Sequence, residues 1–158
     1  MKRNRRTLMG YRSDVAYVIR FDKEETLREF AALVSLKGEH ERSALNECIV
    51  QFDDFPELCF EATDVKWYDS YEDVQAHQAL LDFASNEFGD RCAYRFIRIG
   101  EDDDDVVRIA MGNQELEPYE EFYISRTINV PFYYQTGRGD IVEQLDRLTK
   151  KEKNNAES

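Results

Sequence analysis

The chain has 158 residues, and 33 Asp and Glu against 21 Lys and Arg give it a formal net charge of −12 at pH 7. Its 42% hydrophobic and 13% aromatic content supplies enough apolar surface for the core of one domain, which excludes disorder throughout. The negative charge excludes nucleic acid and anionic membranes as favoured direct partners and favours basic surfaces. No apolar run approaches the roughly 20 residues of a membrane helix, so we expect a cytoplasmic protein.

Positive charge is concentrated at the N-terminus. Five basic residues precede the first acidic one, so residues 13–158 carry a net charge of −17 against −12 for the whole chain: Lys2, Arg3, Arg5, Arg6 and Arg12. We predict a flexible basic leader at residues 1–8, a single α+β domain at residues 9–149 and a disordered tail at residues 150–158.

The first half of the chain predicts three strands and a helix. Alternating apolar residues indicate a strand at 15–21, and a capping-box pattern at Asp22 opens a helix that Gly38 ends. A short irregular or helical piece follows near residues 39–45. Strands are expected at 47–52 and 58–67, joined by a turn that contains Pro56.

The second half predicts a long helix and a hairpin. The helix opens at Ser70 and runs to Phe88, with an apolar stripe at helical spacing formed by Val74, His77, Leu81, Ala84 and Phe88. A hairpin follows, with strands at 91–99 and 106–111. A further strand at 121–129 and a helix that opens at Asp140 complete the chain. This order predicts an α+β fold with a ferredoxin-like β-α-β-β-α-β core and an extra C-terminal strand and helix.

The hairpin tip carries five consecutive acidic residues. A calcium loop that started at Asp102 would need glycine at its sixth position and glutamate at its twelfth, where the chain has Val107 and Asn113. The run therefore fits a solvated turn or a surface that contacts a partner. A metal-dependent hydrolase that uses Asp and Glu ligands stays a minor alternative.

Further acidic residues and a pair of tyrosines complete the predicted contact surface. About 17 excess negative charges match the charge of roughly 30 Å of DNA duplex, so a DNA mimic is an open alternative if the carboxylates share a face. The predicted partner-binding residues are Glu101, Asp102, Asp103, Asp104, Asp105, Glu115, Glu117, Glu120, Glu121, Tyr133 and Tyr134.

Catalytic groups are few. His77 lies on the apolar stripe of its helix, which favours a core histidine, and His40 lies among charged residues. The three cysteines are odd in number and form no CxxC pair, which favours reduced thiols over zinc ligands. We predict no catalytic residue, no metal and no cofactor.

Residues 9–15, Met-Gly-Tyr-Arg-Ser-Asp-Val, run into an aliphatic strand and an acidic helix. This opening resembles small uncharacterised acidic proteins of bacteriophages and prophages, and the match covers mainly residues 9–37. The basic leader departs from that pattern. The resemblance transfers no catalytic residue. It implies an accessory protein that inhibits host or defence machinery.

These observations predict a non-enzymatic protein that binds a basic macromolecular surface, most simply a nucleic-acid-binding complex of a host or defence system. An immunity or antitoxin-like protein that neutralises one basic toxin is the first alternative. A virion or assembly component is another. The sequence leaves the oligomeric state open, including a homodimer.

Overall fold

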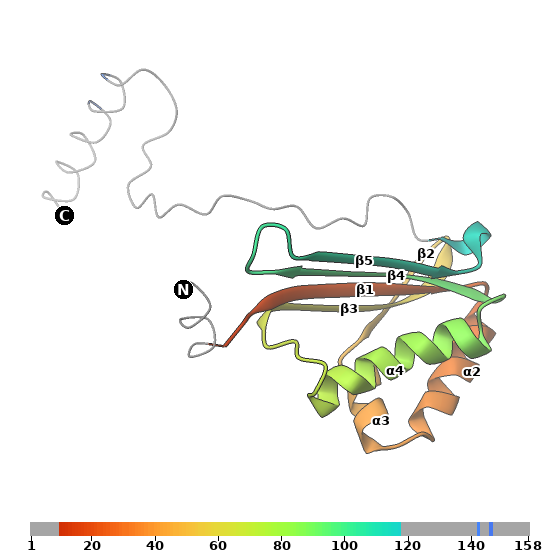
Figure 1. The fold of residues 1–158 in the computed structure, drawn as a ribbon. Helices are drawn as coiled ribbons and strands as arrows, with labels where there is room; N and C mark the ends of the chain where they lie inside the picture. Colours follow the sequence, from red (N-terminus) through yellow and green to blue (C-terminus); the bar gives the residue numbers. More distant parts are fainter. Residues whose placement is uncertain (1–9, 118–141, 143–145, 147–158) are drawn as a thin grey trace, which may run out of the picture. The chain divides into compact units, whose positions relative to one another are not determined.

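The computed structural model describes residues 10–117, Val142 and Asp146 (Figure 1). The chain divides into two units, Met1–Ile124 and Ser125–Ser158. In the second unit Val142 and Asp146 are helical and fall within the predicted last helix. The predicted strand at 121–129, the leader and the tail lie outside the described residues, and the single-domain boundary stays a prediction.

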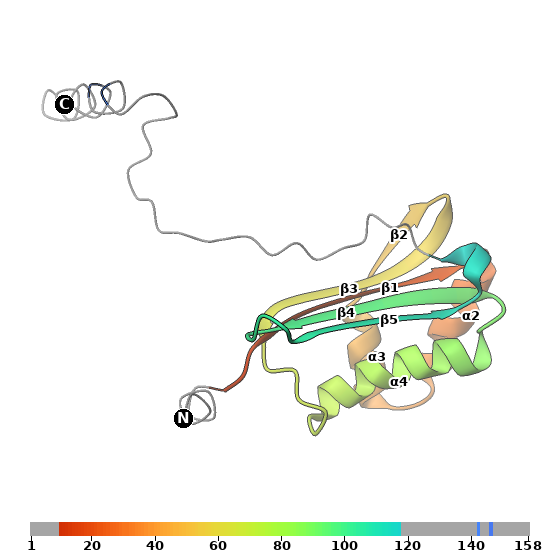
Figure 2. The same cartoon turned by 45° about the horizontal axis from the view of Figure 1, so that its top comes forward.

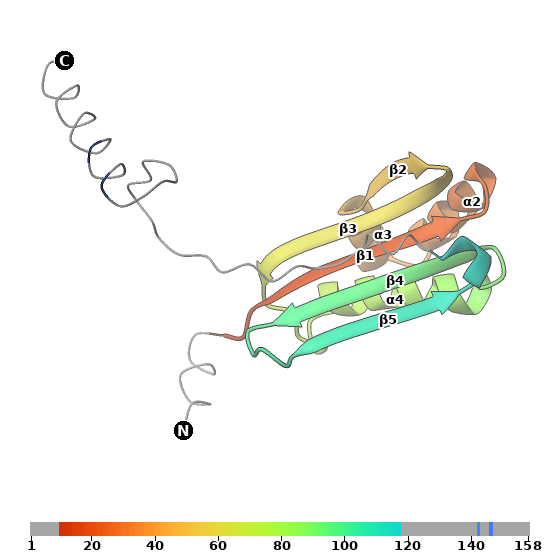
Figure 3. The same ribbon diagram turned by 90° about the horizontal axis from the view of Figure 1, so that it is seen from above.

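The first unit is built on a five-stranded antiparallel sheet with the order β2-β3-β1-β4-β5. Figure 3 shows the five strands side by side, with β1 in the centre. The strands are β1 (Ser13–Phe21), β2 (Ile49–Asp53), β3 (Phe55–Val65), β4 (Cys92–Gly100) and β5 (Val106–Gly112).

Three helices cover one face of this sheet (Figures 1 and 2). They are α2 (Glu24–Ser35), α3 (Glu39–Asn46) and α4 (Glu72–Glu87), and the short 3₁₀ helix η1 (Gln114–Leu116) follows β5. Among the described residues, no helix has the length and apolar character that crossing a membrane requires.

The core lies between the helices and the sheet. Alternate side chains of β1 point to the helices, and Val15, Tyr17, Ile19 and Phe21 are all buried. The ring of Phe30 on α2 packs against several aromatic rings, with its centroid 5.2 Å from that of Phe21. Aromatic pairs of this kind each add about 1 kcal/mol beyond their buried area.

The predicted α+β class is confirmed, but the predicted β-α-β-β-α-β order is not matched. Along the chain the described order is β-α-α-β-β-α-β-β. The difference at the first crossover is α3, a regular helix that we expected only as an irregular or helical piece. Its sequence signal is weak because Ala44 is its only buried residue. At the end, β5 adds an edge strand to this order, and it confirms the strand predicted at 106–111.

The prediction of a turn at Pro56 is wrong. Pro56 is buried inside β3 and pairs with Phe52, while Asp54 alone occupies the turn with a φ of 60°. Aspartate tolerates this left-handed conformation because its short side chain interacts with the local backbone. The two strands therefore meet closer to the tip than the proline suggested.

The predicted capping box at Asp22 is also wrong, and Ser70 is not the N-cap of α4. The helix α2 begins after Lys23 and α4 after Tyr71, and neither N-cap side chain bonds to its helix. The Asp22 carboxylate accepts a hydrogen bond from the Thr26 hydroxyl instead, at 2.5 Å.

Candidate functional site

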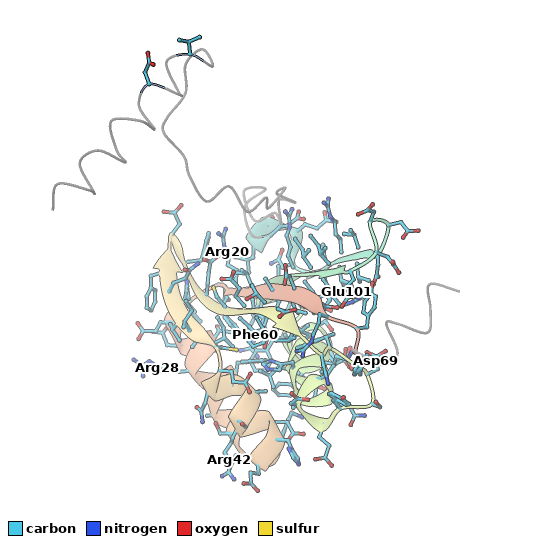
Figure 4. All side chains as sticks on the ribbon, turned by 90° about the vertical axis from the view of Figure 1, so that its left-hand side faces the viewer. Arg20, Arg28, Arg42, Phe60, Asp69 and Glu101 are labelled. Carbon is cyan, nitrogen blue, oxygen red and sulfur yellow. The ribbon has the colours of Figure 1, made fainter. Side chains whose placement is uncertain are left out.

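The acidic turn between β4 and β5 lies where β1 begins and β3 ends, because Ser13 pairs with Gly100 on one side and with Val65 on the other. We call residues 11–14, 64–69 and 100–105 together the hairpin end. Figure 4 looks onto this part of the sheet, with Glu101 and Asp69 labelled.

Tyr11 joins three segments of the hairpin end. Its hydroxyl donates to Asp105 Oδ2 at 2.6 Å and accepts from the backbone N–H of Asp102 at 3.1 Å. Its own backbone N–H donates to the hydroxyl of Tyr68 at 2.6 Å. Burial, together with the carboxylate of Asp105, raises the pKa of Tyr11, so the phenol stays protonated and can donate.

Arg98 on β4 holds Asp105 through two hydrogen bonds, of 2.8 Å and 3.0 Å. This paired geometry is among the stronger ion contacts in proteins. The hydrogen bonds to Asp105 raise the pKa of Arg98. Asp105, which we predicted to contact a partner, therefore bonds to Arg98 within the hairpin, and this contact fixes the shape of the hairpin tip.

Arg12 ties a second acidic residue into the same structure. Its backbone N–H donates to Glu101 Oε1 at 2.7 Å, and its guanidinium reaches the carbonyl of Asp64 at 3.2 Å. The Asp14 carboxylate accepts from the N–H of Asp64 at 2.9 Å. The backbone of Asp64 has a φ of 54°. These contacts hold the start of β1 against the end of β3.

The hairpin end carries more acidic than basic side chains. The acidic ones are Asp14, Asp64, Asp69, Glu101, Asp102, Asp103, Asp104 and Asp105, and the basic ones are Arg12 and Lys66, with Arg98 next to them on β4. Asp103 and Asp104 at the tip are exposed, as are Asp64 and Asp69 beside it. Crowded carboxylates in solvent attract cations and basic groups, and repel anions.

The second predicted acidic group lies elsewhere. Glu115 and Glu117 follow the far end of β5, and a seven-residue strand spans about 23 Å. Glu117 Oε1 accepts from Arg95 Nη2 at 2.6 Å. The structure therefore does not bring these glutamates to the hairpin end. Glu120, Glu121, Tyr133 and Tyr134 lie outside the described residues.

His77 is buried in the core, as its place on the apolar stripe predicted. Its Nδ1 lies 2.7 Å from the Tyr17 hydroxyl and its Nε2 lies 3.1 Å from Glu47 Oε2. The Tyr17 hydroxyl also lies 3.4 Å from Cys48 Sγ. Burial lowers the pKa of His77, and Glu47 opposes this shift. The network satisfies polar groups inside an aromatic core, which is a structural role.

The cysteines are all free. Cys92 is buried and donates to the carbonyl of Ala84, and burial raises the pKa of its thiol to about 12. Burial likewise raises the pKa of Cys59 to about 12. These thiols stay protonated at neutral pH and are poor nucleophiles. Within the described part of the chain, no group of three or more His, Cys, Asp or Glu is placed to hold a metal ion.

The contacts that hold the hairpin end together were not predictable from the sequence. In the sequence Tyr11 and Arg12 stand out as part of the opening motif, but their hydrogen bonds join the start of β1 to the hairpin. The role of Tyr68 had no sequence signal, because its partner Tyr11 lies 57 residues away along the chain. Arg98 meets Asp105 only because β4 and β5 pair, which brings the two residues together across the hairpin. No protein-family model, no curated protein and no solved structure matches this chain.

Proposed function

We propose that this protein is a non-enzymatic binding module that presents the hairpin end to a basic surface on another protein. The observation that carries the proposal is the gathering of exposed carboxylates on a turn that Arg98 and Tyr11 hold in shape. A fixed array of charge binds with a smaller loss of conformational freedom than a flexible acidic tail does.

The whole-chain charge supports the same partner. A protein of net charge −12 attracts basic proteins over several ångströms and raises their association rate, and this effect weakens with added salt. A surface that binds nucleic acid in a host or defence complex carries the positive charge that such a partner needs. We propose that this activity takes place in the cytoplasm of a bacterial host, and the resemblance of residues 9–37 to phage proteins supports this proposal.

We further propose that the fold is a variant of the ferredoxin-like arrangement. In this interpretation α3 is an insertion in the first crossover and β5 is an addition at the sheet edge. The adjacency of β1 to both β3 and β4, with β2 outside β3, supports it.

The test is capture from a lysate of a plausible bacterial host with the tagged chain, followed by mass spectrometry after washes at low and high salt. A variant with Asp103→Lys and Asp104→Lys reverses charge at exposed positions of the tip. The matched control carries Asp82→Lys and Glu87→Lys, which are exposed positions on α4.

We expect a basic protein that is retained at low salt, weakened at high salt and lost with the tip variant but not with the control. Equal retention by both variants would contradict the role of the hairpin end. Capture of no specific protein at either salt concentration would contradict the proposed class of partner.

A further inference from the structure

The strand β2 lies at an edge of the sheet and is paired with β3 alone among residues 10–117. An edge strand presents backbone N–H and C=O groups along its outer side, and these groups can pair with another extended chain. Soluble proteins usually block such an edge with lysine, proline, a bulge or a covering element. In β2, the sequence Ile-Val-Gln-Phe-Asp contains neither lysine nor proline.

The side chains of β2 are unusually apolar for an exposed edge. Ile49 is 64% exposed, Val50 is 54% exposed and Phe52 is 66% exposed. Since side chains alternate along a strand, Val50 and Phe52 lie on the helix side of the sheet, and Ile49 lies on the other side. An added strand would therefore find apolar contacts on both faces.

The charge around β2 selects between possible occupants. Residues 46–54 contain Glu47, Asp53 and Asp54 and no Lys or Arg. The Glu47 side chain is 50% exposed, and its contact with His77 holds it near the start of the strand. A second copy of this chain would bring the same acidic groups and another net charge of −12 to this edge. Repulsion between like charges therefore disfavours a second copy, and attraction between opposite charges favours a basic segment.

We infer that β2 is a strand-addition site for an extended segment of a basic protein. This inference rests on the proposed function, because it says which part of the basic partner binds: an extended segment that pairs with β2. The segment adds a sixth strand beside β2. Its backbone bonds to the outer side of β2, its alternate apolar side chains cover Val50 and Phe52, and its flanking Lys or Arg side chains lie near Glu47 and Asp54.

The probe is a fluorescein-labelled peptide, Arg-Lys-Val-Thr-Ile-Thr-Val-Lys-Arg, and fluorescence anisotropy measures its binding to the full chain. Two control peptides test the mechanism. One carries N-methyl groups on successive backbone amides of its Val-Thr-Ile-Thr-Val segment, which blocks strand pairing along both edges of the peptide. The other has Glu in place of each Arg and Lys, which reverses the charge and keeps the strand propensity.

The test variant is Phe52→Lys, which puts a gatekeeper charge on the edge. The matched control is Leu36→Lys, because Leu36 is 82% exposed at the end of α2 and receives the same change of side chain and charge. Both positions are exposed, so both variants should keep the melting temperature of the parent within a few degrees. Hydrogen exchange followed by NMR locates the bound peptide.

We expect the basic peptide to bind at low salt and to protect alternate backbone amides within Ile49–Asp53. Phe52→Lys should weaken binding about tenfold or more, and Leu36→Lys should change it less than twofold. The N-methylated and acidic peptides should bind at least about tenfold more weakly than the basic peptide.

Three results would overturn this inference. They are an affinity unchanged by Phe52→Lys, equal binding of the N-methylated peptide, and a dimer of the parent chain that Phe52→Lys dissociates. The last would identify a second copy as the occupant. If a basic protein is captured through Asp103 and Asp104 while no peptide binds β2, the proposed function stands and only the strand-addition site fails.

Discussion

His77 occupies the centre of the core, where aromatic rings surround its imidazole. The ring centroid of Phe60 lies 4.1 Å from that of His77, and that of Trp67 lies 5.6 Å away. Both ring nitrogens have partners, Tyr17 and Glu47. A neutral imidazole suits this site, because it offers one donor and one acceptor and has no charge to desolvate.

This environment makes stability depend on pH. Burial lowers the pKa of His77 below its usual 6.5, against the opposing effects of Glu47 and Asp73. Below pH 6.5 His77 therefore binds a proton in the unfolded chain while it is still neutral in the folded chain. The free energy of unfolding consequently falls as the pH drops from 7. The slope that His77 contributes approaches about 1.4 kcal/mol per pH unit at most.

Urea unfolding of the parent, of His77→Gln and of His40→Gln between pH 7.5 and 5.5 measures this slope. The His77 variant should lose stability overall and show a flatter pH dependence than the parent. His40→Gln makes the same substitution at an exposed position and is the control for the change of side chain itself. Identical slopes for the parent and the His77 variant would show that this imidazole is not the group that titrates.

Arg20 and Glu57 form a second buried polar contact, on the other face of the sheet. Their side chains are each 4% exposed, and Arg20 Nε donates to Glu57 Oε2 at 2.9 Å. Gln51 Nε2 donates to the other carboxylate oxygen at 2.8 Å. Removing one charge takes away the buried carboxylate or guanidinium that the other charge contacts, whereas replacing both by apolar groups avoids the cost of burying either charge.

We therefore expect Glu57→Gln to lower the free energy of unfolding by about 3 kcal/mol in guanidinium titrations. The double variant Arg20→Met, Glu57→Leu should recover most of that loss. The exposed pair of Arg28 and Glu24 provides the comparison, and Glu24→Gln should cost about 0.5 kcal/mol or less. A double variant less stable than Glu57→Gln would argue that the charges themselves are required.

The β4–β5 hairpin contains adjacent aspartates, Asp104 and Asp105, in different environments. Asp105 bonds to Arg98 and Tyr11, whereas Asp104 is an exposed residue of the tip. We expect Asp105→Asn to lower the free energy of unfolding by about 1–2 kcal/mol, and Asp104→Asn to change it by about 0.5 kcal/mol or less. Chemical unfolding at pH 7 distinguishes them. Equal effects would contradict the anchoring role of Asp105.

Periodicity predicted most of these elements because burial leaves a regular pattern in a strand or helix. The strand around Tyr17 has apolar residues at every second position, and the helix around His77 has them at helical spacing. Both elements lie at the centre of the fold. The sequence was misleading at Pro56, because a proline can begin a strand as readily as a turn. The edge position of β2 was not predictable, since pairing order depends on distant segments rather than on Ile49 or Phe52.

The net charge of the molecule was predictable from the sequence, but the positions of the carboxylates on the folded surface were not. The acidic run of the hairpin stands out in the sequence, but Asp64 and Asp69 join it only through folding. Likewise Glu117 was grouped with the hairpin acids, whereas β5 separates them. Local sequence cannot decide which carboxylates are used internally, because the choice depends on partners such as Arg98.

The net charge of −12 also affects stability through self-repulsion, and the basic leader reduces it. Deleting residues 1–8 removes four positive charges, those of Lys2, Arg3, Arg5 and Arg6, and brings the net charge to −16. Repulsion grows with the square of the charge, so screening by salt should stabilise the truncated chain about 1.8-fold more than the full chain. Thermal unfolding of both chains in 10 mM and 500 mM NaCl at pH 7.5 measures the two gains in melting temperature. A truncated chain that gains no more than the full chain would mean that specific ion pairs, rather than net charge, set the response to salt.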